Sequence, residues 1–337
     1  MTDGQGTMGR CERIRAALRR EPTDRPAISL WRHFPGQDGT PRGLADATVA
    51  FQRAYDVDLV KLMPTGMYAV MDYGVRVAPS GDAIGTTRFD SGPIRATEDW
   101  GRLPSVSAST GTLGAQVETV RLVRAALGAG TPVVQTIFSP LTMAVKLAGA
   151  ADAVVRAAEE RPQILRGALA RMADDVVAFG RACLDAGANG FFFATQLAAA
   201  SALPEGMYRR FGVPFDLQVL GALREGAWCT ILHLHGLDPM FELADEYPID
   251  AVNWHDRETS PSLAEAMSLT TRALVGGIAR RRAIASGQPD QAAAEVRDAI
   301  RQTNGRVIVA PGCVIPYQAA HENLLAARRA VDPTRPT

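Results

Sequence analysis

The chain has 337 residues, of which 47% are hydrophobic, enough for one large domain with a substantial core. Lys+Arg and Asp+Glu are both 36, and a net charge of zero leaves no electrostatic footprint for nucleic acid or an anionic membrane. No stretch approaches the ~18 uninterrupted apolar residues of a membrane span. The cysteines Cys11, Cys183, Cys229 and Cys313 are too scattered for a disulfide framework, which predicts a cytoplasmic protein.

In chain order, a polar, Gly-rich stretch at 1–10 predicts a flexible tail without a secretory signal, followed by one domain over 11–337. Helix and strand then alternate. Up to residue 138 we expect a helix at 11–20, a strand at 27–31, a helix at 44–55, a strand at 58–62, a β-hairpin within 74–95, a helix at 113–127 and a strand at 132–138.

The second half continues the alternation. We expect helices at 141–147 and 151–186, the latter divided by Pro162, a strand at 190–194, a helix at 204–226, a strand at 229–233, a helix at 239–246, a strand at 251–254, a helix at 262–268, a strand at 272–275, a helix at 290–303, a strand at 307–310 and a helix at 321–331.

Eight short apolar strands separated by helices are typical of a parallel sheet buried on both faces. This number favours closure into a (β/α)8 (TIM) barrel, with the hairpin as a small insertion after strand two. A doubly wound open sheet is the alternative. No Gly-x-Gly-x-x-Gly follows a strand, so its dinucleotide-binding form has no support.

Histidines concentrate where a barrel carries its functional residues, just past the C-terminal ends of the strands. Of five histidines in the chain, four stand at these positions: His33, His233, His235 and His255. A random distribution would scatter them over helices and loops, so this pattern favours function over a purely structural role.

A metal site is the sharpest hypothesis, with His233, His235, His255 and Cys313 as ligands. Imidazole and thiolate suit Zn²⁺, although Fe²⁺, Ni²⁺ or Cu²⁺ are also compatible. His233 and His235 are two residues apart, so in a continued strand they face the same side. Alternatively, His235 only bonds backbone and Cys313 is a small buried residue.

Further candidates follow the same strand ends. Asp256 and Glu258 could ligate the metal or orient an imidazole, so we group them with His233 and His255 as catalytic candidates. Arg32 could clamp a substrate carboxylate or phosphate, or form a surface ion pair. By position, the other substrate-binding candidates are His33, Tyr68, Gln196 and Asn253. Lys61 lies inside a strand, facing either the barrel interior or a covering helix.

Several segments together resemble one known family. They are the opening helix followed by Thr23-Asp24-Arg25-Pro26, the segment Ser139-Pro140-Leu141-Thr142, and Pro311-Gly312-Cys313-Val314-Ile315-Pro316 with Glu322-Asn323-Leu324 after it. This pattern resembles the uroporphyrinogen decarboxylase superfamily, over nearly the whole chain. That superfamily includes corrinoid- and thiol-dependent methyltransferases and cobalamin-independent methionine synthase, and the resemblance implies a homodimer.

Departures from the family pattern indicate the subgroup. True decarboxylases carry two arginines after strand one and an Asp after strand two, where this chain has only Arg32 and Met63-Pro64-Thr65-Gly66. A substrate with eight carboxylates would lack partners, so we expect no activity on uroporphyrinogen. The methyltransferases have His-x-Cys and a later Cys on zinc, and the corresponding residues here are His233, His235 and Cys313.

The resemblance therefore implies a zinc-dependent methyltransferase acting on a small thiol or related acceptor, with a methyl-corrinoid protein as a candidate donor. His235 in place of a cysteine makes the site less negative. Three alternatives stay open: a decarboxylase or lyase on a small acid held by Arg32 with a histidine moving a proton, a metal-dependent hydrolase, and a non-catalytic binding protein. Fold alone does not choose among them.

Overall fold

The computed structural model describes residues 7–332, and eight parallel strands form its central sheet. Their order around the sheet is β1-β10-β9-β8-β7-β6-β5-β2. The strands are β1 Ala27–Ile28, β2 Val60–Leu62, β5 Val133–Phe138, β6 Gly190–Thr195, β7 Cys229–Leu234, β8 Ala251–Trp254, β9 Ala273–Ile278 and β10 Val307–Pro311. The Asp58 N–H donates to the Ile28 carbonyl at 2.8 Å, which joins the two end strands. The predicted (β/α)8 barrel is confirmed.

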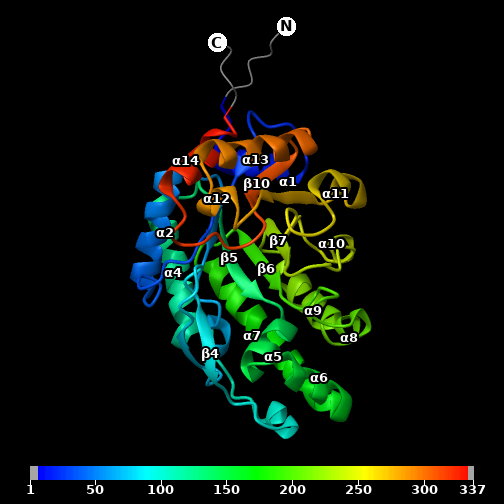
Figure 1. Ribbon diagram of the computed structural model, residues 1–337. Helices are drawn as coiled ribbons and strands as arrows, with labels where there is room; N and C mark the ends of the chain where they lie inside the picture. Colours follow the sequence, from blue (N-terminus) through cyan, green and yellow to red (C-terminus); the bar gives the residue numbers. More distant parts are fainter. Residues whose placement is uncertain (1–6, 333–337) are drawn as a thin grey trace, which may run out of the picture.

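Helices surround this sheet (Figure 1). They are α1 Arg10–Leu18, α2 Pro41–Tyr55, α3 Tyr68–Met71, α4 Gly111–Leu127, α5 Pro140–Ala148, α6 Ala151–Glu160, α7 Pro162–Asp185, α8 Glu205–Phe211, α9 Val213–Leu223, α10 Leu243–Glu246, α11 Leu263–Leu269, α12 Ala283–Ser286, α13 Pro289–Gln302 and α14 His321–Arg329, with a 3-10 helix at Thr97–Arg102. The expected division at Pro162 is confirmed, because α6 ends and α7 begins there.

Two helix predictions were wrong. The helix expected over 204–226 is split into α8 and α9 at Gly212, where a Cβ would lie 2.9 Å from the Tyr208 carbonyl and ring. Pro214 lacks the N–H needed to continue the ladder of α8. The helix expected over 239–246 begins only at Leu243, because the Met240 N–H instead donates to the Ala198 carbonyl at 2.9 Å.

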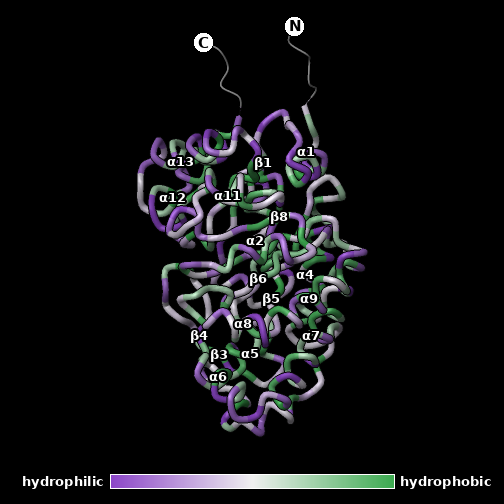
Figure 2. Tube along the Cα trace, turned by 90° about the vertical axis from the view of Figure 1, so that its right-hand side faces the viewer, coloured by the Kyte–Doolittle hydropathy of each residue, from purple (hydrophilic) through white to green (hydrophobic). Residues whose placement is uncertain are grey.

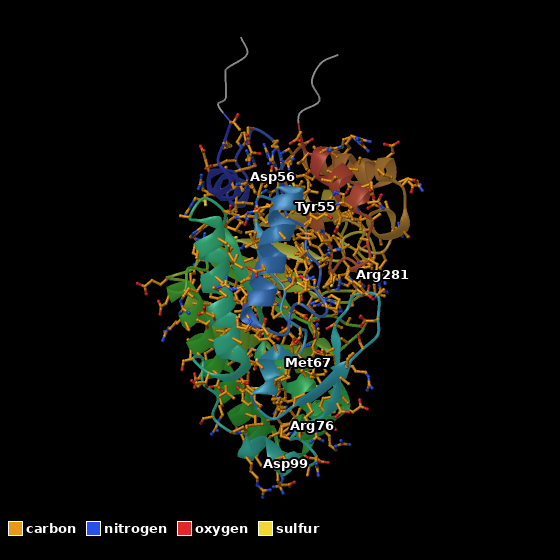
Figure 3. The ribbon with its side chains drawn as sticks, turned by 90° about the vertical axis from the view of Figure 1, so that its left-hand side faces the viewer. Tyr55, Asp56, Met67, Arg76, Asp99 and Arg281 are labelled. Carbon is orange, nitrogen blue, oxygen red and sulfur yellow. The ribbon has the colours of Figure 1, made fainter. Side chains whose placement is uncertain are left out.

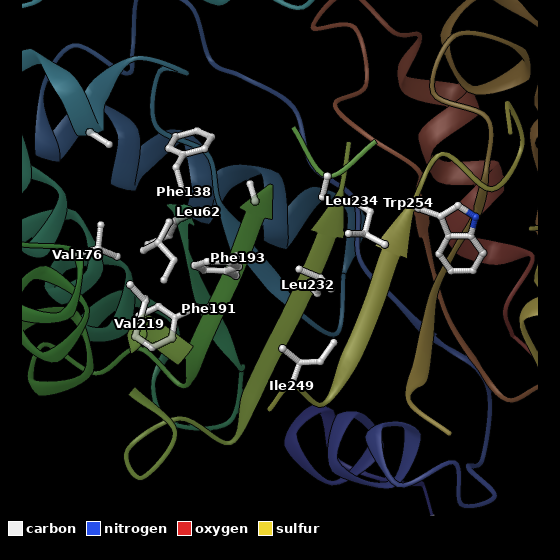
Figure 4. Packing of buried hydrophobic residues seen from close by; sticks show 14 of the residues in the cluster. Leu62, Phe138, Val176, Phe191, Phe193, Val219, Leu232, Leu234, Ile249 and Trp254 are labelled. Carbon is white, nitrogen blue, oxygen red and sulfur yellow. The ribbon is translucent and has the colours of Figure 1, made fainter. Parts of the chain in front are cut away.

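The strands have a two-residue alternation between the inside and outside of the barrel. Phe191 and Phe193 belong to the apolar cluster between the sheet and the helices, whereas Phe192 between them belongs to the cluster inside the barrel. Figure 4 shows the outer layer, with Phe191 close to Val219 of α9. Hydrophobic stretches accordingly gather at the centre of the molecule (Figure 2).

A buried carboxylate fastens the end of the barrel where the strands begin. Asp58 is fully buried, and its carboxylate accepts from Arg13 Nη1 at 2.7 Å, from Arg25 Nη1 at 2.7 Å and from the Ile28 N–H at 3.0 Å. In Figure 3, Asp56 just before β2 lies above Met67, which follows β2, so the strands run from this end toward the hairpin. Asp58 thus ties α1 and β1 to β2.

The predicted hairpin insertion is present as β3 Arg76–Pro79 and β4 Thr87–Ser91, paired antiparallel. Gly85 at its tip has a φ of +69°, a left-handed backbone conformation that favours glycine, and an added Cβ would lie 2.8 Å from Pro35. The Tyr317 N–H donates to the Ala83 carbonyl at 3.1 Å. The loops after β1 and β10 therefore hold the hairpin against the barrel mouth.

The two glycines at this contact both have left-handed backbone conformations. Gly36, in the loop after β1, has a φ of +81°, and Gly85 has a φ of +69°. Both lie in the region that favours glycine, so a side chain at either position would be strained. The close approach of the hairpin to Pro35 therefore depends on Gly85.

Further features bear on the remaining predictions. All four cysteines are free. Within residues 7–332, no helix is both long and apolar enough to cross a membrane. Most of the expected tail at 1–10 lies outside the described residues, although α1 already begins at Arg10 and the Met8 N–H donates to Asp24. The single domain over 11–337 stays a prediction.

Candidate metal centre

The alternation of the strands brings the predicted metal ligands together. On β7, Leu232 and Leu234 pack outward, so His233 between them faces the barrel interior, and His235 follows two residues later. His233 pairs in register with Asn253 of β8, and His255 again follows two residues later. The inward positions of two neighbouring strands thus bring three imidazoles to the barrel mouth.

Cys313 reaches the same place from the loop after β10. Gly312 allows this approach, because a Cβ there would lie 2.8 Å from the Trp254 carbonyl and 3.0 Å from the His255 Cα. His235 Nδ1 lies 3.7 Å from Cys313 Sγ. The ring centroids of His235 and His255 are 4.8 Å apart.

One ligand atom from each of His233, His235, His255 and Cys313 lies within 4.8 Å of the others. A tetrahedral zinc site requires ligand atoms about 3.3–3.8 Å apart, given bonds of about 2.0–2.3 Å. Small side-chain rotations would therefore suffice. His255 Nε2 is buried and has no hydrogen-bond partner among the described residues, as expected of an atom that accepts a metal. The residues present fit a metal ion.

Asn253 determines which nitrogen of His233 is available. Its Nδ2 donates to the Val275 carbonyl at 2.8 Å and to the Pro311 carbonyl at 3.2 Å, which fixes the amide orientation. Its Oδ1 then faces His233 Nδ1 at 2.6 Å and accepts the proton of that nitrogen. The Nε2 lone pair of His233 is left free to bind a metal.

Burial keeps the imidazoles in the neutral form that binds metals. It lowers the pKa of His235 to about 3 and that of His255 to about 4, and it lowers the pKa of His233 well below its usual range. Burial also raises the pKa of the Cys313 thiol. Metal binding at Cys313 must therefore release a proton from the thiol.

We expect Asn253→Ala to weaken zinc binding about 10–100-fold, because His233 loses the acceptor that fixes its tautomer. Competition with a chromophoric chelator measures this affinity. Asn323→Ala is the matched control, since Asn323 is also buried but donates to the Ala283 and Gly287 carbonyls rather than to a residue of the cluster. Equal zinc affinity of the two variants would contradict the role given to Asn253.

The two acidic candidates differ in their surroundings. Glu258 Oε2 lies 3.7 Å from His255 Nδ1, and Glu258 also pairs with Arg280 at 3.1 Å. It is placed to orient His255. Asp256 instead accepts from the Gly277 N–H at 3.1 Å and packs against Gly276 and Gly277 of β9. Burial raises the pKa of Asp256 to about 7.

A cavity of about 210 Å³ opens over the cluster. Among its lining residues are His233, His235, Cys313, His33 and Gln196, and the hairpin contributes Ile84, Thr86 and Thr87. Burial lowers the pKa of His33 to about 4, so this imidazole is neutral near pH 7. Of the five substrate-binding candidates, His33 and Gln196 thus reach the cavity.

The other three candidates do not line it. Arg32 Nη1 donates to the Tyr317 carbonyl at 2.6 Å, and its guanidinium lies over the Phe51 ring at 5.4 Å. The Tyr68 hydroxyl donates to the Thr136 carbonyl at 2.6 Å. Asn253 is committed to His233 and the two carbonyls. These side chains bond to backbone carbonyls or pack on aromatic neighbours instead of facing the cavity, and the sequence does not reveal those partners.

Sequence reasoning left the orientation of Lys61 open and did not identify Lys146 or Arg280 as residues of the cavity. Lys61, Lys146 and Arg280 line it. Lys61 follows the inward register of Leu59 and Met63, so the strand alternation could have found it. Lys146 lies on α5 and Arg280 beyond β9, where neither register nor a motif identifies their direction.

Fold and site together define a (β/α)8-barrel protein with a buried His/Cys cluster at the C-terminal ends of its strands. Residues 10–333 match the family described as uroporphyrinogen decarboxylase (URO-D), and the chain belongs to this family.

Named relatives include methylcobamide:CoM methyltransferases. That of Methanosarcina mazei is 24% identical over 243 residues, covering 67% of this chain and 69% of the relative. That of Methanosarcina acetivorans is 19% identical over 327 residues, covering 93% of this chain and 94% of the relative.

Solved structures show the same fold. A methyltransferase from Methanosarcina mazei superimposes with a TM-score of 0.84 at 19% identity, covering 96% of this chain and 98% of the other. A B12-independent methionine synthase from Shewanella sp. W3-18-1 gives a TM-score of 0.58 at 13% identity, covering 91% and 95%. At these identities the likeness establishes the fold.

Proposed function

We propose that this protein is a zinc-dependent methyltransferase that transfers a methyl group from a corrinoid-bound donor to a small thiol or related acceptor. The observation that carries this proposal is the convergence of four ligand atoms within 4.8 Å at the floor of a cavity. The methyltransferase names of the relatives support the reaction class.

Each residue of the cluster has a definite part in this proposal. His233, His235 and Cys313 would hold the metal, and His255 would be a fourth ligand that the acceptor thiol replaces. A bound zinc ion lowers the pKa of a coordinated thiol, so that the acceptor attacks as a thiolate. Asn253 fixes the tautomer of His233, and Glu258 orients His255. Trp31, Phe138 and Phe192 supply apolar walls that limit water around the acceptor.

The donor and the setting are part of the same proposal. We propose a methyl-corrinoid protein as the donor and a homodimer as the assembly. We also propose the reducing cytoplasm as the compartment, because four free cysteines are expected there. The decarboxylase alternative relied on Arg32, whose guanidinium is engaged outside the cavity.

Zinc-loaded protein incubated with methylcobalamin and a small thiol tests the proposal. We expect a methyl thioether in mass spectrometry, loss of the methyl–cobalt absorbance, and dependence of both on zinc. The variant His321→Ala should behave like the parent, because His321 bonds Tyr55 far from the cluster. Protein that stays metal-free after reconstitution, or zinc-loaded protein that forms no thioether, would overturn the proposal.

A further inference from the structure

The chain contains almost no lysine, and both of its lysines stand at the same cavity. Of 36 basic residues only two are lysines, Lys61 and Lys146, and the rest are arginines. Both lysines are among the residues that line the cavity over the metal cluster. A guanidinium stays protonated in proteins, whereas an amine can lose its proton and act as a nucleophile. The only side-chain amines of the chain are therefore gathered where a ligand could reach them.

Lys61 is buried in apolar surroundings. It is 7% exposed, and its amine nitrogen lies 4.3 Å from the Phe192 ring centroid and 5.4 Å from that of Trp31. Within residues 7–332 its only hydrogen-bond contact is Met63 Sδ, and it takes part in no ion pair. The metal cluster and its hydrogen-bond partners do not use this side chain, so its burial has no explanation in the site described above.

The cavity offers no counter-charge for an ammonium at this position. Besides Lys61, its ionisable lining residues are His33, Lys146, His233, His235, Arg280 and Cys313. None of them is a carboxylate, and only a negative charge on Cys313 would favour the ammonium. Aromatic rings attract a cation, but removing an unpaired charge from water costs more. Burial therefore lowers the pKa of Lys61 to about 7, against about 8 for Lys146.

Two polar atoms of residues in the cavity wall are buried without a partner. They are Thr87 Oγ1 and His33 Nδ1, and neither has a hydrogen bond within the described residues. Burial and, after it, the charge of Lys61 lower the pKa of His33, so the two side chains are within electrostatic range. A hydroxyl can donate to a carbonyl oxygen, and a neutral imidazole can pass a proton from an amine to that oxygen. Amine, hydroxyl and imidazole together suit a carbonyl group.

We propose that Lys61 is an imine-forming nucleophile and that the cavity takes a small aldehyde or ketone as a covalent ligand. The amine nitrogen attacks the carbonyl carbon and forms a C–N bond. The carbon–oxygen bond then breaks, and the oxygen leaves as water with the two amine hydrogens. Water reverses the same steps and releases the ligand. The reaction needs neither a metal nor a methyl donor, so it goes beyond the proposed function and does not rest on it.

The size and lining of the cavity limit the carbonyl compounds that fit. Its volume of about 210 Å³ lies below the roughly 300–1,000 Å³ of sites for drug-sized molecules. Trp31, Phe138 and Phe192 give it apolar walls, which suit a short aliphatic chain. Propanal combines a reactive carbonyl with such a chain and is therefore the probe we choose.

Reductive trapping on the full-length protein at pH 7 tests the proposal. Cyanoborohydride, a hydride donor, converts the imine with propanal into a stable propyl-lysine, and peptide mapping separates Lys61, Lys146 and the amino terminus. An amine with a pKa of about 7 has a neutral fraction about 10³ times that of an ordinary lysine at this pH. Because a weaker base is also a weaker nucleophile, we expect Lys61 to be labelled at least about 10-fold faster than Nα-acetyl-lysine in the same tube. Lys61 should also react faster than Lys146.

The same chain denatured in urea is the matched control. Lys61 then returns to water, so its labelling rate should fall to that of Nα-acetyl-lysine. Lys146→Met should keep the fast label on Lys61, and Lys61→Met should lose it. The site is read in the parent chain, so the result does not depend on the folding of either variant. Labelling of folded Lys61 no faster than the reference, or fast labelling of Lys146 in its place, would overturn the proposal.

Discussion

Replacing His235 with alanine is expected to weaken zinc binding by more than about 100-fold, because loss of an outer partner of a ligand alone costs about 10–100-fold. His235 lies between His255 and Cys313, with Nδ1 3.7 Å from the Cys313 sulfur. Its loss removes one ligand and leaves Cys313 with a raised thiol pKa. Methyl transfer should fall with metal occupancy.

Elemental analysis of dialysed protein and chelator competition measure this effect. His321→Ala is the matched control, since it also removes a histidine but leaves the cluster intact. Melting temperatures of metal-free samples should agree between His235→Ala and the parent, because the neutral His235 side chain makes no hydrogen bond other than that to Cys313 among the described residues. Zinc content of His235→Ala equal to that of the control would remove His235 from the proposed ligands.

Asp58→Ala is expected to destabilise the fold by about 3–5 kcal/mol, the usual cost of removing one partner from a buried ion pair. Arg13 and Arg25 both donate to this carboxylate, and so does the Ile28 N–H. The loss falls where β1 meets β2, at the closure of the barrel. In a chain of this size we expect the melting temperature to drop by roughly 4–7 °C.

Asp46→Ala provides the comparison, because Asp46 forms an exposed pair with Arg42 at 4.0 Å. A surface pair contributes about 0–1 kcal/mol, so its melting temperature should change little. Urea titration of the two variants measures the difference in unfolding free energy. If both aspartates proved equally dispensable, the arginine cluster at Asp58 would not be what holds the barrel closed.

The sequence predicted what depends on local periodicity. Apolar runs identified the eight strands, and the spacing of His233 and His235 predicted a shared face, because side chains alternate along a strand. Cys313 was included because it stands just past the last predicted strand, and the family resemblance supported it. Its approach to His255 depends on Gly312, whose significance appears only when the chain after β10 lies against the end of β8.

The substrate-binding candidates show where such reasoning fails. Arg32 follows strand one, yet a carbonyl of Tyr317, 285 residues away, captures its guanidinium. Tyr68 bonds the Thr136 carbonyl rather than facing the cavity. Position after a strand limits where a side chain starts, but long-range partners decide where its end lies. Lys146 was missed for the same reason, since α5 carries no strand register.

The amide of Asn253 has a consequence for the barrel as a whole. Asn253 lies on β8 and joins His233 on β7 to carbonyls of β9 and β10, so the hydrogen bonds of one side chain depend on the relative positions of four strands. A cation bound by the cluster would favour only the folded barrel, and thermodynamic linkage then makes folding stability depend on free zinc. At 100 times the dissociation constant the gain is about 2.7 kcal/mol. The concentration of free zinc would thereby set the fraction of chains that are unfolded at any moment.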